Sequence, residues 1–591
     1  MSSPSERPLA EPTAPAIDPV TLSILWNRLL SIAEEMGSTL RRTAFSEAVR
    51  EGDDFSTGIF DRHARLIAQG NFTPGHTGAM PSMVRSVLAV FPPDTLRPGD
   101  AVLSNDSFLG SGHFPDMFLV TPVFLEERIV GYMVNIAHHV DVGGAAPGSQ
   151  EVAGVTSAVQ EGLRILPVKI IREGVFEADI LRIITGNVRV PQKLLGDLKA
   201  QRNANFVGAQ RYLELYEEHG AALLDAVVEE ILDRSEKRMR ESIAVLPDGL
   251  YSFTDWVDDA GPGSEPIRVQ VDLRIDGDRM VLDFSGSSDQ VNAGINSYIN
   301  YTRAYSSFAV KVLANALLPQ NDGAARPIEV TARAGCFFNP VYPAPSGGRA
   351  AVQIRIFEAV NGALAQVLPH KAMGAHSHWS NPNISGIDDR SGRQFLQYDL
   401  IFGGLGALSY KDGCEAMSPV MNCSNIPIEI LEAGNPVLFH CLAFIPDSAG
   451  AGRNRGGCAL RKDVEILNST ATVTLLGDRH RFQPYGLFGG RPGVSARTVL
   501  RHGNEEVELS SKETRRLERG DVLSFRLSGA GGYGDPSERS VERIEADLAD
   551  GFITAVGAAR DYQVTVDGGK LTRSQGTDPS TAAPGIDRGP N

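Results

Sequence analysis

The spacing of apolar residues changes along this chain, and the change excludes a fold built from one kind of secondary structure. Between Leu22 and Leu40, apolar residues recur every three or four positions, which is the period of one helix face. Between Ile267 and Phe284 they alternate with polar residues around a DGD turn, which predicts a β-hairpin with one buried face. We therefore expect a multidomain protein of mixed α/β (α+β) class.

Helix signals punctuate the first two thirds of the chain. An Asp-Pro pair at 18–19 is typical of a helix start, with the acidic residue as the cap. Residues 191–244 are rich in helix-forming residues and are interrupted at Gly220, which predicts two helices joined by a turn. Two further helices are expected over 300–320 and 351–368.

The same patterns divide the chain into segments. Glycine is dense after residue 400, where short β-like runs replace helical periodicity. The predicted segments are a disordered N-terminus at 1–17, an N-terminal α/β region with long helices at 18–248, a middle α+β region at 249–400, a β-rich and glycine-rich C-terminal region at 401–568, and a disordered tail at 569–591.

Composition excludes several classes of function. The chain of 591 residues carries a formal net charge of −16, which argues against a basic surface for nucleic acid. It contains no run near the ~20 apolar residues of a membrane span, and its polar N-terminus does not resemble a signal peptide. The five cysteines form no C-x-x-C pair. We expect a cytoplasmic protein that binds neither nucleic acid nor membrane.

Histidines and carboxylates gather in one neighbourhood of this acidic chain. His113 and Asp116 lie in GHFPDM, at the junction of a loop and an apolar strand, and His138 ends the next predicted strand. Imidazole nitrogen with carboxylate oxygen is a ligand set for Mn, Zn or Fe. The pattern predicts a divalent-metal site at two neighbouring strand ends; the alternative is a group of ordinary loop histidines.

Residue spacing alone does not identify every ligand of this site. His138 and His139 point to opposite faces of a strand, so one of them is expected to ligate. A carboxylate of Glu51, Asp53 or Asp54 could complete the shell, and Asp141 could hydrogen-bond a ligand histidine. A second pair of histidines, His376 and His378, is more often structural or substrate-contacting than metal-binding.

Other catalytic signatures are missing. The chain has no G-x-x-x-x-G-K-[ST] loop for ATP and no G-x-S-x-G nucleophile motif. Its glycine-rich stretches lack the strand–turn–helix order of a phosphate loop, and β turns explain them better. Metal-assisted chemistry is therefore the mechanism that the residues favour.

In series, the motifs resemble the hydantoinase B/oxoprolinase family. The stretches that carry the resemblance follow one another between about 18 and 565: EGDDFSTGIFD, NDSFLGSGHFPDMFLVTPVF, AHHVDVGG, GNVRVPQKLLGDLKAQRNANFVGAQR, DSAGAGRNRGG, LLGDRHRFQPYGLFGGRPG and GAGGYGDPSER. Two stretches depart from the family pattern. NDSFLGSGHFPD lacks the proline of NDPYLGGTHLPD, and AMSPVMNCSN lacks a family histidine, which leaves the substrate class open.

The resemblance implies a B (β) subunit of an ATP-dependent cyclic-amide hydrolase that acts on a hydantoin, 5-oxoproline or another lactam. A partner A-type subunit would hold ATP and Mg and phosphorylate this small-molecule substrate, in a heteromultimer such as α2β2. By the same resemblance, the metal ligands are Glu51, His113, Asp116 and His138.

Hydrolysis would then be an attack of water on the activated carbonyl, with the metal lowering the pKa of that water. Asp141, Asp54 and His139 are the expected catalytic residues, which orient ligands or move protons. The alternatives are a subunit of an ATP-dependent ketone carboxylase, a non-catalytic structural subunit, and a stand-alone metallohydrolase.

Overall fold

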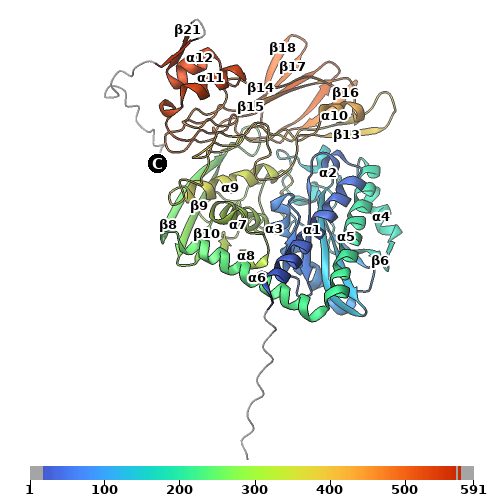
Figure 1. Ribbon diagram of the computed structural model, residues 1–591. Helices are drawn as coiled ribbons and strands as arrows, with labels where there is room; N and C mark the ends of the chain where they lie inside the picture. Colours follow the sequence, from blue (N-terminus) through green and yellow to red (C-terminus); the bar gives the residue numbers. More distant parts are fainter. Residues whose placement is uncertain (1–16, 568–569, 574–591) are drawn as a thin grey trace, which may run out of the picture.

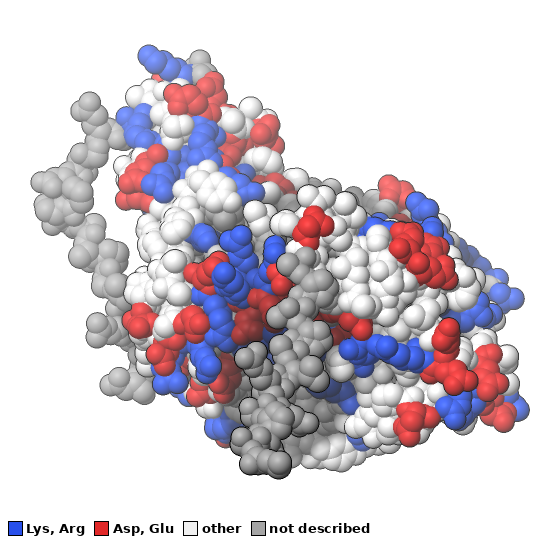
Figure 2. All heavy atoms as spheres, turned by 60° about the horizontal axis from the view of Figure 1, so that its bottom comes forward, with Lys and Arg blue, Asp and Glu red and all other residues white. Residues whose placement is uncertain are grey.

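A computed structural model describes residues 17–567 and 570–573 of the chain. The predicted disordered segments fall largely outside these residues. Helices and several β-sheets alternate as expected for a mixed α/β multidomain protein, and this prediction is confirmed (Figure 1). No described helix combines the length and apolar character that crossing a membrane requires. Figure 2 shows acidic and basic side chains interspersed over one face of the molecule.

A seven-stranded sheet organises the N-terminal region, with strand order β2-β1-β5-β4-β3-β6-β7. Its strands are β1 (Phe55–Asp61), β2 (Leu66–Gln69), β3 (Ala101–Ser104), β4 (Asp116–Leu125), β5 (Arg128–His138), β6 (Val168–Arg172) and β7 (Val175–Phe176). Helices α1 (Pro19–Thr43) and α5 (Pro191–His219) contact this sheet, as does α3 (Pro74–Val90). The side chains at alternate positions of β1 and β5 enter two different cores, one with α1 and α5 and the other with α3.

The long helices follow the predicted pattern. The side chain of Asp18 caps α1 by accepting from the main-chain N–H groups of Val20 and Thr21. All six apolar positions of the predicted face are buried: Leu22, Leu25, Leu29, Ile32, Met36 and Leu40. Gly220 separates α5 from α6 (Ala221–Ala244), which confirms the predicted pair. Gly220 has φ 77°, a conformation that favours glycine.

The middle region contains a second sheet, of order β11-β10-β9-β8. Its strands are β8 (Gly249–Val257), β9 (Ile267–Asp276), β10 (Arg279–Asp283) and β11 (Ile328–Thr331). Strands β9 and β10 form the predicted hairpin. Helices α7 (Ile299–Asn315) and α9 (Ala350–Leu364) pack against this sheet and against one another, and α8 (Asp322–Ala325) contacts α6.

The C-terminal region is rich in β-structure, as predicted. Two sheets, β14-β15-β20-β17-β18 and β13-β12-β16-β19, enclose one apolar core. Their strands are β12 (Asn383–Ile387), β13 (Gln394–Tyr398), β14 (Val437–Ile445), β15 (Ala459–Ile466), β16 (Thr470–Thr474), β17 (Arg497–His502), β18 (Glu505–Leu509), β19 (Thr514–Glu518) and β20 (Val522–Arg526). The remaining elements are α2 (Glu47–Arg50), α4 (Ala178–Thr185), α10 (Ile428–Gly434), α11 (Val541–Ala549), α12 (Ala555–Tyr562) and the hairpin of β21 (Val564–Asp567) and β22 (Lys570–Arg573).

The glycine-rich stretches of this region lie against one another. A Cβ added at Gly529 would lie 1.8 Å from the main-chain oxygen of Ser448, and one at Gly531 would lie 1.9 Å from that of Tyr485. Side chains at these glycines would therefore force the loops apart. The glycines allow close approach of main chain to main chain, a role that the β-turn interpretation of the sequence does not include.

The largest apolar core joins segments that the sequence analysis separates. It includes Phe118 of β4, Met280 of β10 and Leu476 after β16. The domain boundaries at 248 and 400 stay a prediction. Strands β12 and β13, which precede residue 400, form one sheet with β16 and β19, which follow it.

The two sides of α1 give a direct test of core packing. Leu25 is fully buried, whereas the preceding Ile24 is 53% exposed. We expect Leu25→Ala to lower the free energy of unfolding by about 3 kcal/mol, because it removes buried methyl groups and leaves a cavity. Ile24→Ala should change it by less than about 0.5 kcal/mol. Denaturant unfolding followed by circular dichroism measures both; equal effects would contradict the buried face.

Candidate metal centre

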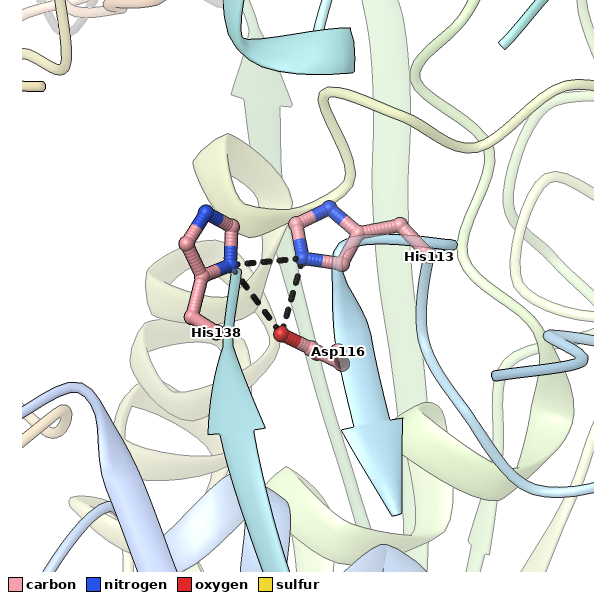
Figure 3. A group of neighbouring side chains, drawn as sticks. All are labelled: His113, Asp116 and His138. Carbon is pink, nitrogen blue, oxygen red and sulfur yellow. Dashed lines mark hydrogen bonds and ion pairs between the residues drawn. The ribbon is translucent and has the colours of Figure 1, made fainter. Parts of the chain in front are cut away.

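Two neighbouring strand ends bring His113, Asp116 and His138 together. Asp116 begins β4, His138 ends β5, and the two residues are paired across the antiparallel ladder. Figure 3 shows the three side chains converging: His113 Nε2 lies 3.0 Å from Asp116 Oδ1 and 3.2 Å from His138 Nδ1, and His138 Nδ1 lies 3.1 Å from the same oxygen. All three side chains are buried. The predicted juxtaposition is present.

Hydrogen bonds fix the loop that carries His113. The hydroxyl of Ser111 donates to the main-chain oxygens of His113 (2.6 Å) and Asp116 (3.0 Å). The side-chain amide of Asn105 donates to the main-chain oxygen of Phe114 at 2.7 Å. The His-x-x-Asp segment is thus held at both ends before any ligand binds, which is the pre-organisation that a metal site requires.

The protonation of His113 suits a metal ligand. Its Nδ1 lies 2.7 Å from the main-chain oxygen of Gly347, an acceptor, so Nδ1 carries the proton and Nε2 presents its lone pair to the group. Burial lowers the pKa of His113 to about 4, because the charged imidazolium would lose its hydration. The ring is therefore neutral near pH 7.

Asp116 supplies the negative charge of the group. Its Oδ1 faces the two histidines, while Oδ2 accepts from the Tyr301 hydroxyl at 2.9 Å and from the Arg349 guanidinium. Burial by itself would raise the pKa of this carboxyl, but the surrounding His113, Arg349 and His76 hold it well below its usual range. Asp116 is therefore ionised.

The donor set fits a divalent transition metal. One ligand atom from each of the three residues lies within 4.8 Å of the others, and all three side chains are buried. Two imidazoles and one carboxylate are ligands that Mn, Zn and Fe share. A trio of protein ligands also leaves coordination positions for water or substrate.

Among the candidate second carboxylates, Asp54 has a described contact with the group, whereas the described contact of Glu51 is with Arg50. Glu51 follows α2 with a partly exposed side chain, 3.8 Å from Arg50. Asp53 then adopts a left-handed conformation (φ 56°), and Asp54 turns inward immediately before β1. A carboxylate oxygen of Asp54 lies 3.9 Å from Nδ1 of His138.

Asp141 and His139, two of the expected catalytic residues, make other contacts. Asp141 accepts from the Arg189 guanidinium at 2.6 Å and from the Arg189 main-chain N–H at 2.7 Å. His139 points to the opposite face of the strand end, where its Nε2 lies 3.1 Å from Oε1 of Gln201. The described contacts therefore connect both residues to α5 and the segment before it; Asp54 alone of the three faces His138.

Four residues that the sequence analysis does not select surround the two carboxylates. His76 Nε2 lies 3.6 Å from Asp116 Oδ2 and 3.7 Å from Asp54 Oδ1. The Tyr398 hydroxyl donates to Asp54 at 3.1 Å, and the other two are Tyr301 and Arg349. They come from α3, β13, α7 and the residue before α9, far apart in sequence.

Gly112 is the sequence feature beside the site that indicates a large side chain packed against the loop of His113. A Cβ at this position would lie 2.2 Å from Nε of Arg349 and 2.8 Å from the Tyr301 ring. The guanidinium of Arg349 in turn lies 3.9 Å from the centre of that ring. The glycine before His113 therefore leaves space for the guanidinium of Arg349, although the sequence around Gly112 does not identify that residue.

Main-chain groups engage three of the four ring nitrogens of the second histidine pair, His376 and His378. Both ring nitrogens of His378 face main-chain oxygens, of Trp379 at 2.6 Å and of Ala351 at 2.9 Å. Nδ1 of His376 accepts from the main-chain N–H of Gly406 at 3.0 Å. These contacts agree with the structural alternative for this pair.

Glu161 is connected to His113 through the main chain of Gly347. Its Oε1 accepts from the main-chain N–H of Gly347, whose oxygen holds the ring of His113. Its Oε2 is buried without a hydrogen-bond partner in the part of the chain that the structure describes. Burial raises the pKa of Glu161 to about 8, so the carboxyl carries a proton near neutrality.

The comparisons with known proteins agree with the motifs. The family model of hydantoinase B/oxoprolinase matches residues 18–536, and the chain belongs to this family. The putative B component of a D-/L-hydantoinase from Pseudomonas sp. (strain NS671) is 31% identical over 569 residues, which cover 93% of this chain and 95% of that protein.

Two solved structures share the fold. The ATP-dependent caprolactamase from Pseudomonas jessenii superposes with a TM-score of 0.86 and 29% identity, covering 94% of this chain and 97% of that one. The nucleotide-free structure of an acetone carboxylase superposes with the same TM-score of 0.86, over 94% and 81% of the two chains. At 18% identity, the second likeness concerns the fold alone.

The buried carboxyl of Glu161 predicts a pH dependence of stability. Between its ordinary pKa of 4.5 and about 8, the folded state holds a proton that the unfolded state has released. The free energy of unfolding should therefore fall as pH rises through this window, by up to about 1.4 kcal/mol per pH unit. Unfolding at several pH values should show a flatter profile for Glu161→Gln than for the exposed control Glu127→Gln. Parallel profiles would contradict a protonated Glu161.

A matched pair of variants distinguishes the two carboxylates. Asp54→Asn should weaken binding of Mn or Zn by about 10- to 100-fold, because it removes a carboxylate beside the group. Glu51→Gln should leave binding unchanged, since the described contact of its side chain is with Arg50 and not with the triad. Competition against a chromogenic chelator measures both affinities. Loss of affinity in Glu51→Gln alone would reverse the assignment.

Proposed function

We propose that this chain is the metal-binding B-type component of an ATP-dependent cyclic-amide hydrolase. In this proposal an A-type partner chain holds ATP with Mg and phosphorylates a hydantoin, 5-oxoproline or another lactam. The B-type chain then directs water to the activated carbonyl carbon, the ring C–N bond breaks as the nitrogen takes up a proton, and a second water releases the phosphoryl group as inorganic phosphate. The two chains form a heteromultimer such as α2β2.

The buried group of His113, Asp116 and His138 carries the proposal. It stands in a chain that covers 95% of a relative named as a component of a hydantoinase and 97% of a solved ATP-dependent caprolactamase. A lactam carbonyl is a poor electrophile because of amide resonance. ATP-coupled phosphorylation would make the carbonyl carbon more electrophilic, and a Lewis acid would make the attacking water more nucleophilic.

The residues of this chain have separable tasks in the proposal. His113, His138 and Asp116 hold the ion, with Asp54 as the fourth ligand in place of Glu51. When bound, a divalent ion supplies Lewis acidity near neutral pH. Arg349 and the Tyr301 hydroxyl keep Asp116 ionised and oriented, and Tyr398 orients Asp54 by its hydrogen bond.

His76 is the residue of this neighbourhood best placed to contact a reacting group. Its Nε2 lies between the two carboxylates, and its Nδ1 is buried without a hydrogen-bond partner within residues 17–567 and 570–573. A buried polar atom without a partner is unfavourable, and a bound substrate or water would satisfy it. We assign His76 to substrate positioning, and assign Asp141 and His139 to structural support.

Elemental analysis and an activity assay test the proposal together. The full chain should contain about one equivalent of Mn, Zn or Fe, and the His113→Ala/Asp116→Ala double variant should contain none, because two of its three ligands are missing. With the A-type partner, the parent should open a lactam ring in the presence of ATP, and the variant should lose about 100-fold or more of this rate. The variant Lys199→Met, an exposed change on α5, is the control.

The outcomes separate the alternatives. Bicarbonate-dependent carboxylation of a ketone, with no ring opening, would favour the ketone-carboxylase alternative. Ring opening without ATP or a partner would favour a stand-alone metallohydrolase. A metal-free parent after incubation with Mn and Zn, with an active complex that contains the double variant, would favour the non-catalytic structural role.

A further inference from the structure

A cavity of about 520 Å³ opens between α3, α7 and α8, outside the metal group. Its floor is the crossing of α3 and α7, where a Cβ at Gly78 would lie 2.6 Å from the Cβ of Ala304. None of the metal-site residues lines it, although His76 and Tyr301 belong to the same two helices. Its size is that of small-molecule sites in general.

Four basic side chains line this cavity, against two acidic ones. Arg85 of α3, Arg303 and Lys311 of α7, and Arg326 after α8 line it. Arg326 is engaged by Asp233 (3.2 Å) and Glu236 (2.8 Å). The other three cations have no ion-pair partner in the described part of the chain, although the protein as a whole has a net charge of −16.

Two acidic residues also line the cavity and offset part of this charge, since Asp322 interacts electrostatically with Arg85 and Arg326. A carboxylate oxygen of Asp322 accepts from the main-chain N–H of Leu66 at 3.1 Å, and burial raises the pKa of this carboxyl. Glu329 is exposed and makes no described ion pair. Hydroxyl groups of Ser82 and Ser307 add neutral donors between the cations.

Lys311 is the member of the cluster that most needs a ligand. Its ammonium group donates to the main-chain oxygen of Ala316 at 3.0 Å, which is its one described hydrogen bond. Partial burial lowers the pKa of Lys311, and no neighbouring carboxylate opposes that effect. The ammonium therefore has two further donors to offer, and a bound anion would offset the effect of its partial burial.

We propose that this cavity is a binding site for a small organic anion that carries at least two negative charges, as phosphoryl or carboxylate groups. Lys311 and Arg303 contact it from α7, and Arg85 contacts it from α3. The bound anion would therefore connect the two helices that carry His76 and Tyr301. The site is separate from the reaction centre and does not depend on the proposed hydrolase activity.

Equilibrium dialysis of the full chain tests this site directly. Radiolabelled pyrophosphate and radiolabelled succinate are the two probes, and they distinguish phosphoryl from carboxylate ligands. The protein is first treated with a chelator so that no anion binds through a metal. We expect one equivalent of at least one probe to bind, and Lys311→Met and Arg303→Met each to weaken it by about tenfold or more, the effect of losing a charge-assisted hydrogen bond.

Three further variants make the result specific. Arg85→Met, on the other helix, should weaken binding as well, because the anion contacts both helices. Lys311→Arg keeps the charge and should bind, which distinguishes a lost contact from a misfolded variant. Lys199→Met removes an exposed cation elsewhere and should bind like the parent. The inference is overturned if neither probe binds, or if binding is the same in Lys311→Met as in the parent.

Discussion

The negative charge of Asp116 is the constraint around which the N-terminal and middle regions meet. This carboxylate is fully buried, and an isolated charge in such a place would be strongly unfavourable. Its compensation comes from the guanidinium of Arg349 and the hydroxyl of Tyr301, about two hundred residues later in the chain. The seven-stranded sheet and the helices α7 and α9 must therefore pack in one arrangement for the charge to be tolerated.

Sequence reasoning reaches the parts of this site that are close along the chain. His113, Asp116 and His138 belong to one loop and one hairpin, so strand-end logic is enough to bring them together. It does not find His76 or Arg349, since no local pattern indicates which distant helix will face a strand end. Family resemblance selects Glu51 as the second carboxylate, and this selection stays a prediction; the carboxylate that the structure describes beside His138 is that of Asp54.

The same distinction applies to the fold. The periodic face of α1, the break at Gly220 and the β9–β10 hairpin are local features, and each is predictable from residue spacing. The C-terminal sheets are predictable only as β-rich sequence. Their strand order depends on pairings such as β12 with β16, which are about ninety residues apart, and on loops packed so tightly that Gly529 and Gly531 admit no Cβ.

The distance along the chain between Asp116 and its cation has a consequence during synthesis. A ribosome releases the seven-stranded sheet before it has made Arg349, and Tyr398 follows later still. A nascent chain that ends before these residues holds the two histidines and both aspartates without their permanent counter-charges and hydroxyl donors. If the group binds a metal as we propose, the ion can therefore reach its ligands on the unfinished chain, before the later segments enclose them.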